Sequence, residues 1–192
     1  MRLTLHTFLT LDGVLQAPGG PDEDRDGGFE HGGWSYPYGD DDFGTAVMGW
    51  FENADAFLLG RKTYDIFSGH WPKVTDADDP VASKLNALPK YVASTSLSGP
   101  LDWNATLIEG DVAEAVRRLR DQYASIISHG YGQLAATLVD AGLVDEIHAG
   151  IHPFMVGNAE IRLRTPHPVG LQLLEVHRYD SGIIAAKYAP VR

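Results

Sequence analysis

A short apolar segment near residue 60 leads into residues that suit an anion. Residues 56–59 are apolar and are followed by Gly60, Arg61, Lys62 and Thr63. Glycine allows a ligand to approach the backbone closely, and a helix that begins here offers free N–H groups to a phosphate. A solvated helix start is the simpler alternative. Two cations at a helix N-terminus oppose the helix dipole, however, so an anion bound there explains them better.

Hydroxyl side chains follow a second apolar segment. Ser94, Thr95 and Ser96 come directly after residues 91–93. Small hydroxyl residues at this place could bond a ribose or its 2′-phosphate. Serine and threonine also end many strands because their side chains stabilise turns, so this signal is weak by itself.

A glycine-rich segment follows a third predicted strand. Residues 130–135 match the pattern G-x-G-x-x-(G/A) and open a predicted helix, as that pattern requires. The dinucleotide fingerprint also needs an acid at the end of the next strand, whereas Asp145 lies at its beginning. Gly130, Tyr131, Gly132 and Gln133 therefore suit a pyrophosphate or nicotinamide contact, and a Rossmann dehydrogenase is disfavoured.

The elements that must position these segments alternate between strand and helix patterns. Strands are predicted at 2–11, 56–60, 91–93, 106–108, 125–128 and 144–152. Helices are predicted at 43–54, 61–67, 81–88, 112–123 and 134–141. Residues 171–189 read as a hairpin that turns at Asp180-Ser181-Gly182. This order predicts a three-layer α/β fold, with a mostly parallel twisted sheet between helices and an antiparallel C-terminal hairpin. Ligands bind outside the carboxyl ends of strands in such sheets, where all three segments lie.

Bulk properties limit the possible functions. The 192 residues are 44% hydrophobic and 21% charged, which suits one globular domain over residues 1–192. The absence of cysteine excludes disulfides and thiolate metal sites. A net charge of −11 disfavours nucleic acid. No apolar run approaches the roughly 20 residues that a membrane span needs, and the first residues lack signal-peptide features, so we expect a cytoplasmic protein.

The histidines do not suggest a metal site. His148 and His152 are four residues apart on a predicted strand, so they share a face but stand roughly 13 Å apart. That distance is too great for one metal ion, and zinc needs three or four convergent ligands. His129 has no partner that is visible in the sequence. We therefore expect no metal.

The chain resembles the dihydrofolate reductase superfamily, and most of all the branch that includes the reductase domain of bifunctional riboflavin-biosynthesis proteins. The resemblance rests on Thr10-Leu11-Asp12-Gly13, Leu59-Gly60-Arg61-Lys62-Thr63-Tyr64, Lys90-Tyr91-Val92-Ala93-Ser94, Gly130-Tyr131-Gly132, Gly142-Leu143-Val144-Asp145-Glu146-Ile147, Pro153 and Gly157. It implies the dihydrofolate reductase-like fold and NADPH. In this reading, residues 60–63 contact the cofactor phosphates, residues 94–96 lie near the adenosine ribose, and residues 130–133 lie near the pyrophosphate and nicotinamide. Arg61 and Lys62 also favour NADPH over NADH, since the 2′-phosphate needs a positive partner.

The resemblance also implies a substrate side, with a carboxylate on the first helix that assists protonation. Asp42 is the nearest acid, although residues 40–42 also make a good cap for that helix, and the cap is the favoured role. Trp34 and Tyr38 in the long loop 16–40 could stack on a flat substrate or pin the loop to the core. Asp12 could stand at the pocket mouth or serve as a turn acid before glycine.

Together these features predict an NADPH-dependent reductase that transfers a hydride to a small heteroaromatic substrate of pterin or pyrimidine type. The alternative is a non-catalytic nucleotide-binding or regulatory protein that keeps the reductase fold, because a fold does not fix a function. Relatives of the riboflavin type pair as dimers, so a homodimer is expected. No nucleic-acid or membrane partner is expected.

Overall fold

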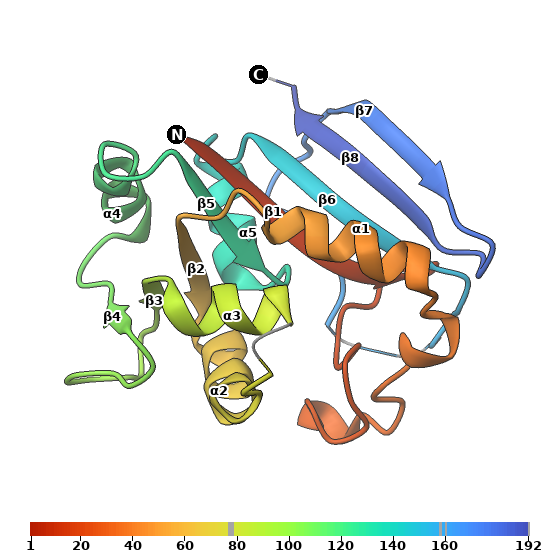
Figure 1. The fold of residues 1–192 in the computed structure, drawn as a ribbon. Helices are drawn as coiled ribbons and strands as arrows, with labels where there is room; N and C mark the ends of the chain where they lie inside the picture. Colours follow the sequence, from red (N-terminus) through yellow and green to blue (C-terminus); the bar gives the residue numbers. More distant parts are fainter. Residues whose placement is uncertain (77–78, 158, 160, 192) are drawn as a thin grey trace.

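One sheet of eight strands forms the centre of the computed structural model, which describes residues 1–76, 79–157, 159 and 161–191 (Figure 1). The strands lie in the order β4-β3-β2-β5-β1-β6-β8-β7. Their bounds are β1 Arg2–Thr10, β2 Ala56–Gly60, β3 Lys90–Ala93, β4 Ala105–Leu107, β5 Ser125–His129, β6 Glu146–His152, β7 Leu171–Arg178 and β8 Ile184–Pro190. All pairs from β4 to β6 are parallel, and β8 pairs antiparallel with β6 and β7. The predicted mostly parallel sheet with a C-terminal hairpin is confirmed.

Helices cover both faces of this sheet (Figure 1). Their bounds are α1 Asp41–Phe51, α2 Arg61–His70, α3 Pro80–Ala87, α4 Val112–Leu119 and α5 Gln133–Asp140. One core cluster joins α4 and α5 to Leu3, Leu5 and Leu58, and a second joins α1, α2 and α3 to Phe57 and Leu59. Alternate residues of one strand thus face opposite layers. The three-layer prediction is confirmed.

The strand β2 shows why the centre of the sheet is apolar. Residues 56–59 are fully buried, because α-helical layers cover both sides of this strand. Parallel strands covered in this way read as continuous apolar runs, which is the pattern that predicted β2. Each strand of the parallel part is followed by a loop or a helix at its carboxyl end, and that edge carries the segments singled out above.

The segment between β1 and α1 is ordered by its own small core. It contains two short 3₁₀ turns, η1 Asp26–Gly28 and η2 Tyr36–Tyr38. A third 3₁₀ turn, η3 Trp71–Lys73, lies outside this segment and follows α2. Buried Val14, Ala17, Phe29 and Trp34 form the cluster that holds this segment against the sheet. Among the described residues, no helix is long and apolar enough to cross a membrane.

Candidate functional site

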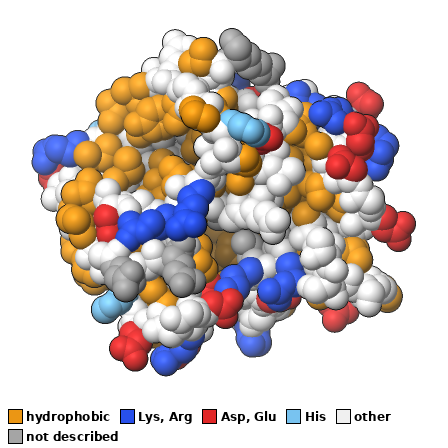
Figure 2. Space-filling model, turned by 180° about the vertical axis from the view of Figure 1, so that it is seen from behind, with side chains coloured by type: hydrophobic (Ala, Val, Ile, Leu, Met, Phe, Trp, Pro, Cys, Tyr) orange, Lys and Arg blue, Asp and Glu red, His pale blue; other side chains and the backbone are white. Residues whose placement is uncertain are grey.

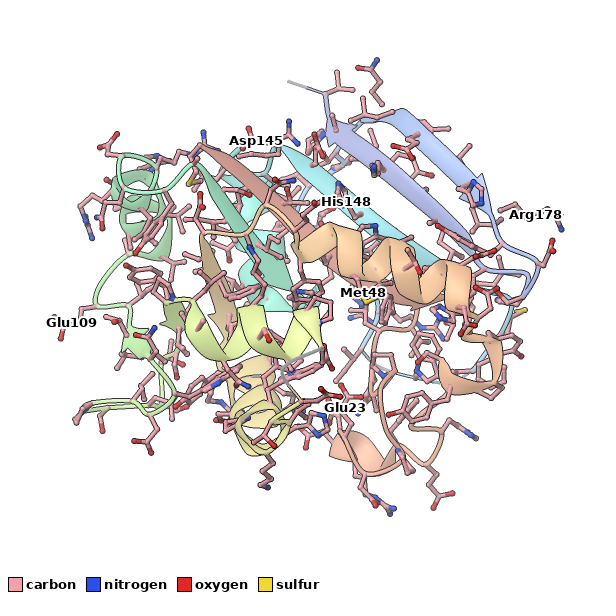
Figure 3. All side chains as sticks on the ribbon, viewed as in Figure 1. Glu23, Met48, Glu109, Asp145, His148 and Arg178 are labelled. Carbon is pink, nitrogen blue, oxygen red and sulfur yellow. The ribbon has the colours of Figure 1, made fainter. Side chains whose placement is uncertain are left out.

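A cleft of about 800 Å³ lies at the carboxyl edge of the sheet, between α1, α2 and the loop after β1. Met48 projects from α1 on one side of it, and Glu23 lies in the loop on the other (Figure 3). Further walls come from β1, from α2, from residues 129–132 at the end of β5 and from Trp71, Asp76 and residues 79–81 after α2. Its volume is within the range of roughly 300–1,000 Å³ that is usual for small-molecule sites.

Two helix N-termini meet beside the cleft. The strands β2 and β5 are neighbours, and α2 begins directly after β2, whereas α5 follows β5 after the turn at residues 130–132. The N-caps of the two helices are Gly60 and Gly132, which offer no capping side chain. Gly130 has a φ of +77°, and a Cβ there would stand 3.4 Å from Oγ1 of Thr63. Glycine at this position therefore permits both the turn and the close approach of the two segments. The uncapped N–H groups make this a suitable place for an anion.

The two cations of the segment 60–63 are already paired. Lys62 Nζ lies 2.8 Å from a carboxylate oxygen of Asp24 and also bonds Asp26, whereas Arg61 bonds Asp65 one helical turn later at 2.7 Å. Partial burial acts to lower the pKa of Lys62, but the hydrogen bonds that its ammonium group donates to the two aspartates outweigh burial and raise that pKa. Carboxylates of the protein therefore already pair with both cations, so these two residues do not by themselves require a bound anion. Lys62 still borders the cleft, and Arg61 does not.

Other predicted cofactor residues are only partly brought together. Thr63, Gly130 and Gly132 border the cleft with Lys62. Tyr131 borders it too, but its side chain is buried in the core on the α4 and α5 side. Gly60 and Gln133 flank the site without bordering the cleft.

Ser94, Thr95 and Ser96 lie outside the cleft. Oγ of Ser94 accepts hydrogen bonds from the backbone N–H groups of Ser96 and Leu97, at 3.1 and 3.0 Å. Ser94 therefore stabilises the turn after β3, which is the simpler of its two predicted roles. Thr95 and Ser96 are exposed at the same turn.

Asp42 does not reach the cleft. It is exposed on the first turn of α1, while Asp40 caps the helix by accepting a hydrogen bond from the N–H of Phe43 at 2.7 Å. The helix begins two residues before the predicted start, at Asp41, so Asp42 lies within its first turn and next to the buried Phe43. The predicted acid on the first helix thus has no counterpart in the cleft geometry.

The aromatic residues of the long loop hold the loop in place. Trp34 is buried, donates from Nε1 to the carbonyl oxygen of Gln16 at 2.7 Å, and meets His152 edge to face at 5.1 Å. Tyr38 packs near Phe154 and the same histidine. Neither ring borders the cleft, and the loop reaches it instead through Gln16–Gly19 and Glu23–Asp24. Of the two predicted roles, the structure shows that Trp34 and Tyr38 hold the loop against the core.

Asp12 joins two loops. Its carboxylate accepts hydrogen bonds from Thr10, from the N–H of Gly157 at 2.8 Å and from the N–H of Val156 at 3.3 Å. Burial acts to raise the pKa of Asp12, but these bonds outweigh it and lower that pKa. Asp12 does not border the cleft, so its position supports the turn role rather than the substrate role.

The cleft also contains residues that sequence reasoning missed. Val47, Trp50 and Phe51 of α1 form an apolar wall, and His6 and His129 lie beneath it. The His129 ring stacks on Phe51 with centroids 4.7 Å apart, and burial lowers the pKa of His129 to about 3. The apolar spacing of residues 43–54 predicted the inner face of α1. The two histidines could be found only from the pairing of β1 with β5, which the sequence pattern does not give.

Taken together, the sheet order, the closing hairpin and the cleft at the carboxyl edge define a protein with the dihydrofolate reductase-like α/β fold. The family model of the RibD C-terminal domain matches residues 2–185. The chain belongs to the RibD C-terminal domain family. Among the described residues, no group of three or more histidine, aspartate or glutamate side chains could hold a metal ion.

Similar proteins cover the whole chain. The uncharacterized protein YyaP of Bacillus subtilis (strain 168) is 26% identical over 97% of this chain and 94% of its own length. A putative riboflavin biosynthesis protein from Shewanella sp. PV-4 superposes with a TM-score of 0.68 at 17% identity, over 100% of both chains. A pyrimidine reductase-like protein from Corynebacterium diphtheriae gives 0.65 at 14% identity, over 100% of this chain and 92% of its own. These structures show the shared fold.

Proposed function

We propose that the protein is an NADPH-dependent reductase that transfers a hydride to a small heteroaromatic substrate of pterin or pyrimidine type. The observation that carries this proposal is the cleft in which an apolar aromatic wall on α1 faces the two uncapped helix N-termini of α2 and α5. Membership of the RibD C-terminal domain family supports a reductase role.

The residues of the cleft fit such a cofactor. Gly130 has the positive φ and the closeness to Thr63 that would let a pyrophosphate approach both helix starts. Gly132 has open space where a Cβ would be. Lys62 supplies a cation at the edge of the cleft. In this proposal, Thr63, Gly130 and Gly132 hold the pyrophosphate, and Lys62 binds a phosphate after releasing its aspartates.

The apolar wall performs the second task, which is to orient a flat ring. Phe8, Trp50 and Phe51 offer aromatic surface beside the floor made by β1 and β5. A water-poor wall of this kind strengthens the polar interactions that fix a substrate. The bound cofactor would supply the hydride, and the protein would supply orientation and a proton.

Lys62 gives the sharpest test of this assignment. We expect Lys62→Met to weaken NADPH binding by about 10- to 100-fold, since a hydrogen bond to a charged group is worth about 1.5–3 kcal/mol. NADH lacks the 2′-phosphate and should lose less affinity if Lys62 meets that group. Isothermal titration calorimetry of the full chain with NADPH and NADH measures both constants.

Arg61→Met is the matched control, because Arg61 stands next in the sequence but pairs with Asp65 outside the cleft. We expect this variant to bind both cofactors like the wild type. Absence of saturable NADPH binding by the wild-type protein would refute the proposed function. Equal losses in the two variants would instead remove the specific role of Lys62.

The position of Asp42 favours a second candidate, a nucleotide-binding or regulatory protein without reductase activity. Asp42 is exposed and outside the cleft, so the predicted carboxylate donor is missing there. This candidate predicts tight NADPH binding with no NADPH oxidation in the presence of dihydropterins or pyrimidine precursors. A fall in the absorbance of NADPH after a substrate is added would indicate the reductase, and constant absorbance would indicate the second candidate.

A further inference from the structure

The cleft continues beyond the starts of α2 and α5 into a space between α1 and residues 66–81, which we call the substrate half. Its walls are apolar and include Val47, Met48, Trp50, Phe67, Trp71 and Val81. Five of these side chains pack against the same core cluster, and α1 lies next to α3 (Figure 1). The two walls therefore enclose one space, which suits a flat ring.

Two carboxylates border the substrate half. Asp76 and Asp79 both line the cleft, and the N–H of Asp79 donates to the carbonyl oxygen of Asp76 at 3.3 Å, so the two residues lie close together. Among the residues that the structure describes, Lys62 is the only lysine or arginine that borders the cleft, and it pairs with Asp24 beside the start of α2. The described part of the substrate half thus holds two acids and neither lysine nor arginine.

The start of α3 borders the substrate half as well, and it is closed to anions. Asp79 is the N-cap and accepts hydrogen bonds from the N–H groups of Val81 and Ala82, each at 2.9 Å. Pro80, the first residue of the helix, has no N–H to offer. The starts of α2 and α5 have glycine caps without a capping side chain. Helix starts bind anions through free N–H groups, so α2 and α5 can receive a phosphate and α3 cannot.

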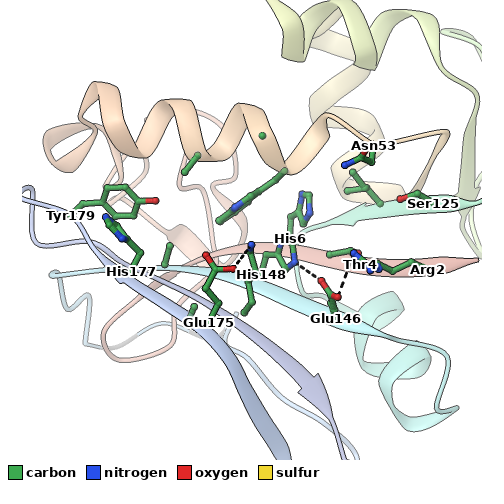
Figure 4. Close-up of a pocket in the computed structure, with 17 residues that line it drawn as sticks. Arg2, Thr4, His6, Asn53, Ser125, Glu146, His148, Glu175, His177 and Tyr179 are labelled. Atoms are coloured by element: carbon green, nitrogen blue, oxygen red, sulfur yellow. Dashed lines mark hydrogen bonds and ion pairs between the residues drawn. The ribbon is translucent and has the colours of Figure 1, made fainter.

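A smaller cavity of about 370 Å³ adjoins the cleft through His6, which borders both spaces. Arg2 lies 3.5 Å from Glu146 in this cavity (Figure 4), and Lys187 lies 2.6 Å from Glu175. The part of α1 that borders it is the carboxyl-terminal half, where the helix dipole is negative. The smaller cavity therefore offers no surplus of positive charge to an anionic group that reaches past the cleft.

We propose that the substrate half selects a flat heteroaromatic ring that carries no phosphate or carboxylate group, and that Asp76 and Asp79 exclude the anionic forms of such a ring. This inference rests on the proposed reductase function. The anionic cofactor uses Lys62 and the two open helix starts, so no anion site is left for the substrate. A phosphate in the substrate half would lose hydration against apolar walls and would face two carboxylates. The uncharged ring gains from burial and stacking on the same walls.

The test compares two pairs of ligands whose members differ in one anionic group. Pterin is compared with pterin-6-carboxylate, and uridine with uridine 5′-phosphate. Isothermal titration calorimetry measures each affinity for the full chain saturated with NADP⁺, which cannot reduce the ligand. We expect the wild type to bind the uncharged member of each pair at least about 10-fold more tightly, because like charges repel strongly where little water separates them. This ratio should fall as the salt concentration rises.

Asp76→Asn combined with Asp79→Asn removes both charges. Asparagine keeps the cap of α3, because its side-chain oxygen also accepts hydrogen bonds from backbone N–H groups. We expect the preference for the uncharged ligand to shrink about 10-fold in this variant. Asp111→Asn is the matched control, since Asp111 caps α4, a helix of the same length, by accepting from the N–H of Glu114 at 2.8 Å outside the cleft. It should keep the wild-type ratio.

Equal affinities within each pair, tighter binding of the anionic member or no binding of either uncharged ligand would overturn the proposal. An unchanged ratio in the double variant would do so as well. If the double variant does not fold, Asp76→Asn alone and the salt dependence of the wild-type ratio decide. A wild-type protein that does not bind NADPH refutes the reductase function. Titration of the same pairs into the wild type and the double variant without cofactor then decides the selectivity separately.

Discussion

Lys90 is a residue whose charge is held in the core without an opposite charge. It is fully buried, and none of the described carboxylates pairs with it. Nζ donates to the carbonyl oxygen of Leu88 at 2.7 Å and lies 4.3 Å from the ring centroid of Trp103. Burial disfavours the charged form and lowers the pKa of Lys90 to about 8. A lysine of this kind makes stability depend on pH above neutrality.

The sign of this dependence follows from proton linkage. The pKa of Lys90 is about 8 in the folded protein and 10.5 in the unfolded chain, so between these values the unfolded chain holds a proton that the folded protein has lost. This lysine therefore makes the free energy of unfolding rise with pH in that window, by up to about 1.4 kcal/mol per pH unit. We expect urea denaturation of the wild type, compared with Lys90→Met, to show this extra slope from about pH 8 to pH 9.5.

Lys73→Met is the control, because Lys73 is exposed in η3. It should keep the wild-type slope. A Lys90→Met variant with the same pH profile as the wild type would show that the ammonium group remains hydrated in the folded protein.

Residue types predicted some site positions and not others. The segments at 60–63 and 130–132 were found because glycine and hydroxyl residues directly follow apolar strands, and both meet at the cleft. The partner of Lys62 could not be found, since Asp24 is 38 residues away in a loop whose path no periodic pattern describes. Asp42 was chosen as the acid nearest to the first helix, and the sequence could not show that its side chain is exposed there and does not border the cleft.

At the scale of elements, the packing of α1 on β1 and β6 shapes the cleft. Gly150 of β6 lies under this helix, and a Cβ there would stand 2.9 Å from Phe43 and 3.0 Å from Phe8. Phe43 also meets Tyr179 at 5.2 Å between ring centroids. The helix can therefore approach the sheet only where β6 has no side chain.

Gly150→Ala should accordingly push α1 away from the sheet. Overpacking of a tight core costs about 1–3 kcal/mol, and we expect this loss in chemical denaturation together with weaker ligand binding in the cleft. Gly49→Ala is the matched control, since Gly49 lies in α1 with open space around it. Alanine in place of an exposed helical glycine should stabilise the protein by about 0.5–1 kcal/mol. Equal stability of the two variants would mean that Phe43 and Phe8 give way without cost.

The elements themselves were predictable because each has a simple period. Apolar runs predicted the buried parallel strands, and apolar residues at helical spacing predicted α1 to α5. The predicted ends of these helices lie within a few residues of the observed ends. The order of strands in the sheet was not predictable in detail, and the positions of the buried histidines depend on it. His6, His129 and His148 are far apart in the sequence, and only the placement of β1 between β5 and β6 brings them into line.

At the scale of the whole molecule, the sheet ends in an apolar edge. Every residue of β7 is exposed, including Leu171, Leu173, Leu174 and Val176, which are 45–56% exposed. Seen from behind, hydrophobic side chains gather on the side of the molecule where the hairpin lies (Figure 2). Exposure of apolar side chains to water is unfavourable, and the unpaired backbone groups of an edge strand pair readily with another strand. We propose that two copies of the chain associate through β7 to form a homodimer.

Leu173→Lys combined with Val176→Lys should therefore produce a monomer. Lysines on an edge strand are charged and hydrated, and so oppose pairing. Sedimentation equilibrium of the wild type should give twice the mass of one chain, and the variant should give the mass of one. Leu163→Lys, at an exposed leucine outside the hairpin, is the control and should remain dimeric. A wild-type protein that sediments as a single chain rules out the proposed dimer.

The pairing of Lys62 with Asp24 and Asp26 has a consequence for selectivity. These carboxylates are attached to the same molecule, so they compete for the lysine at a high effective concentration that dilution cannot change. A small free anion such as inorganic phosphate offers one contact and would lose this competition. A larger ligand that also fills the aromatic wall and both helix starts can displace the tethered acids. The loop would thus act as a built-in competitor, which sets a threshold of affinity that simple anions in the cell do not reach.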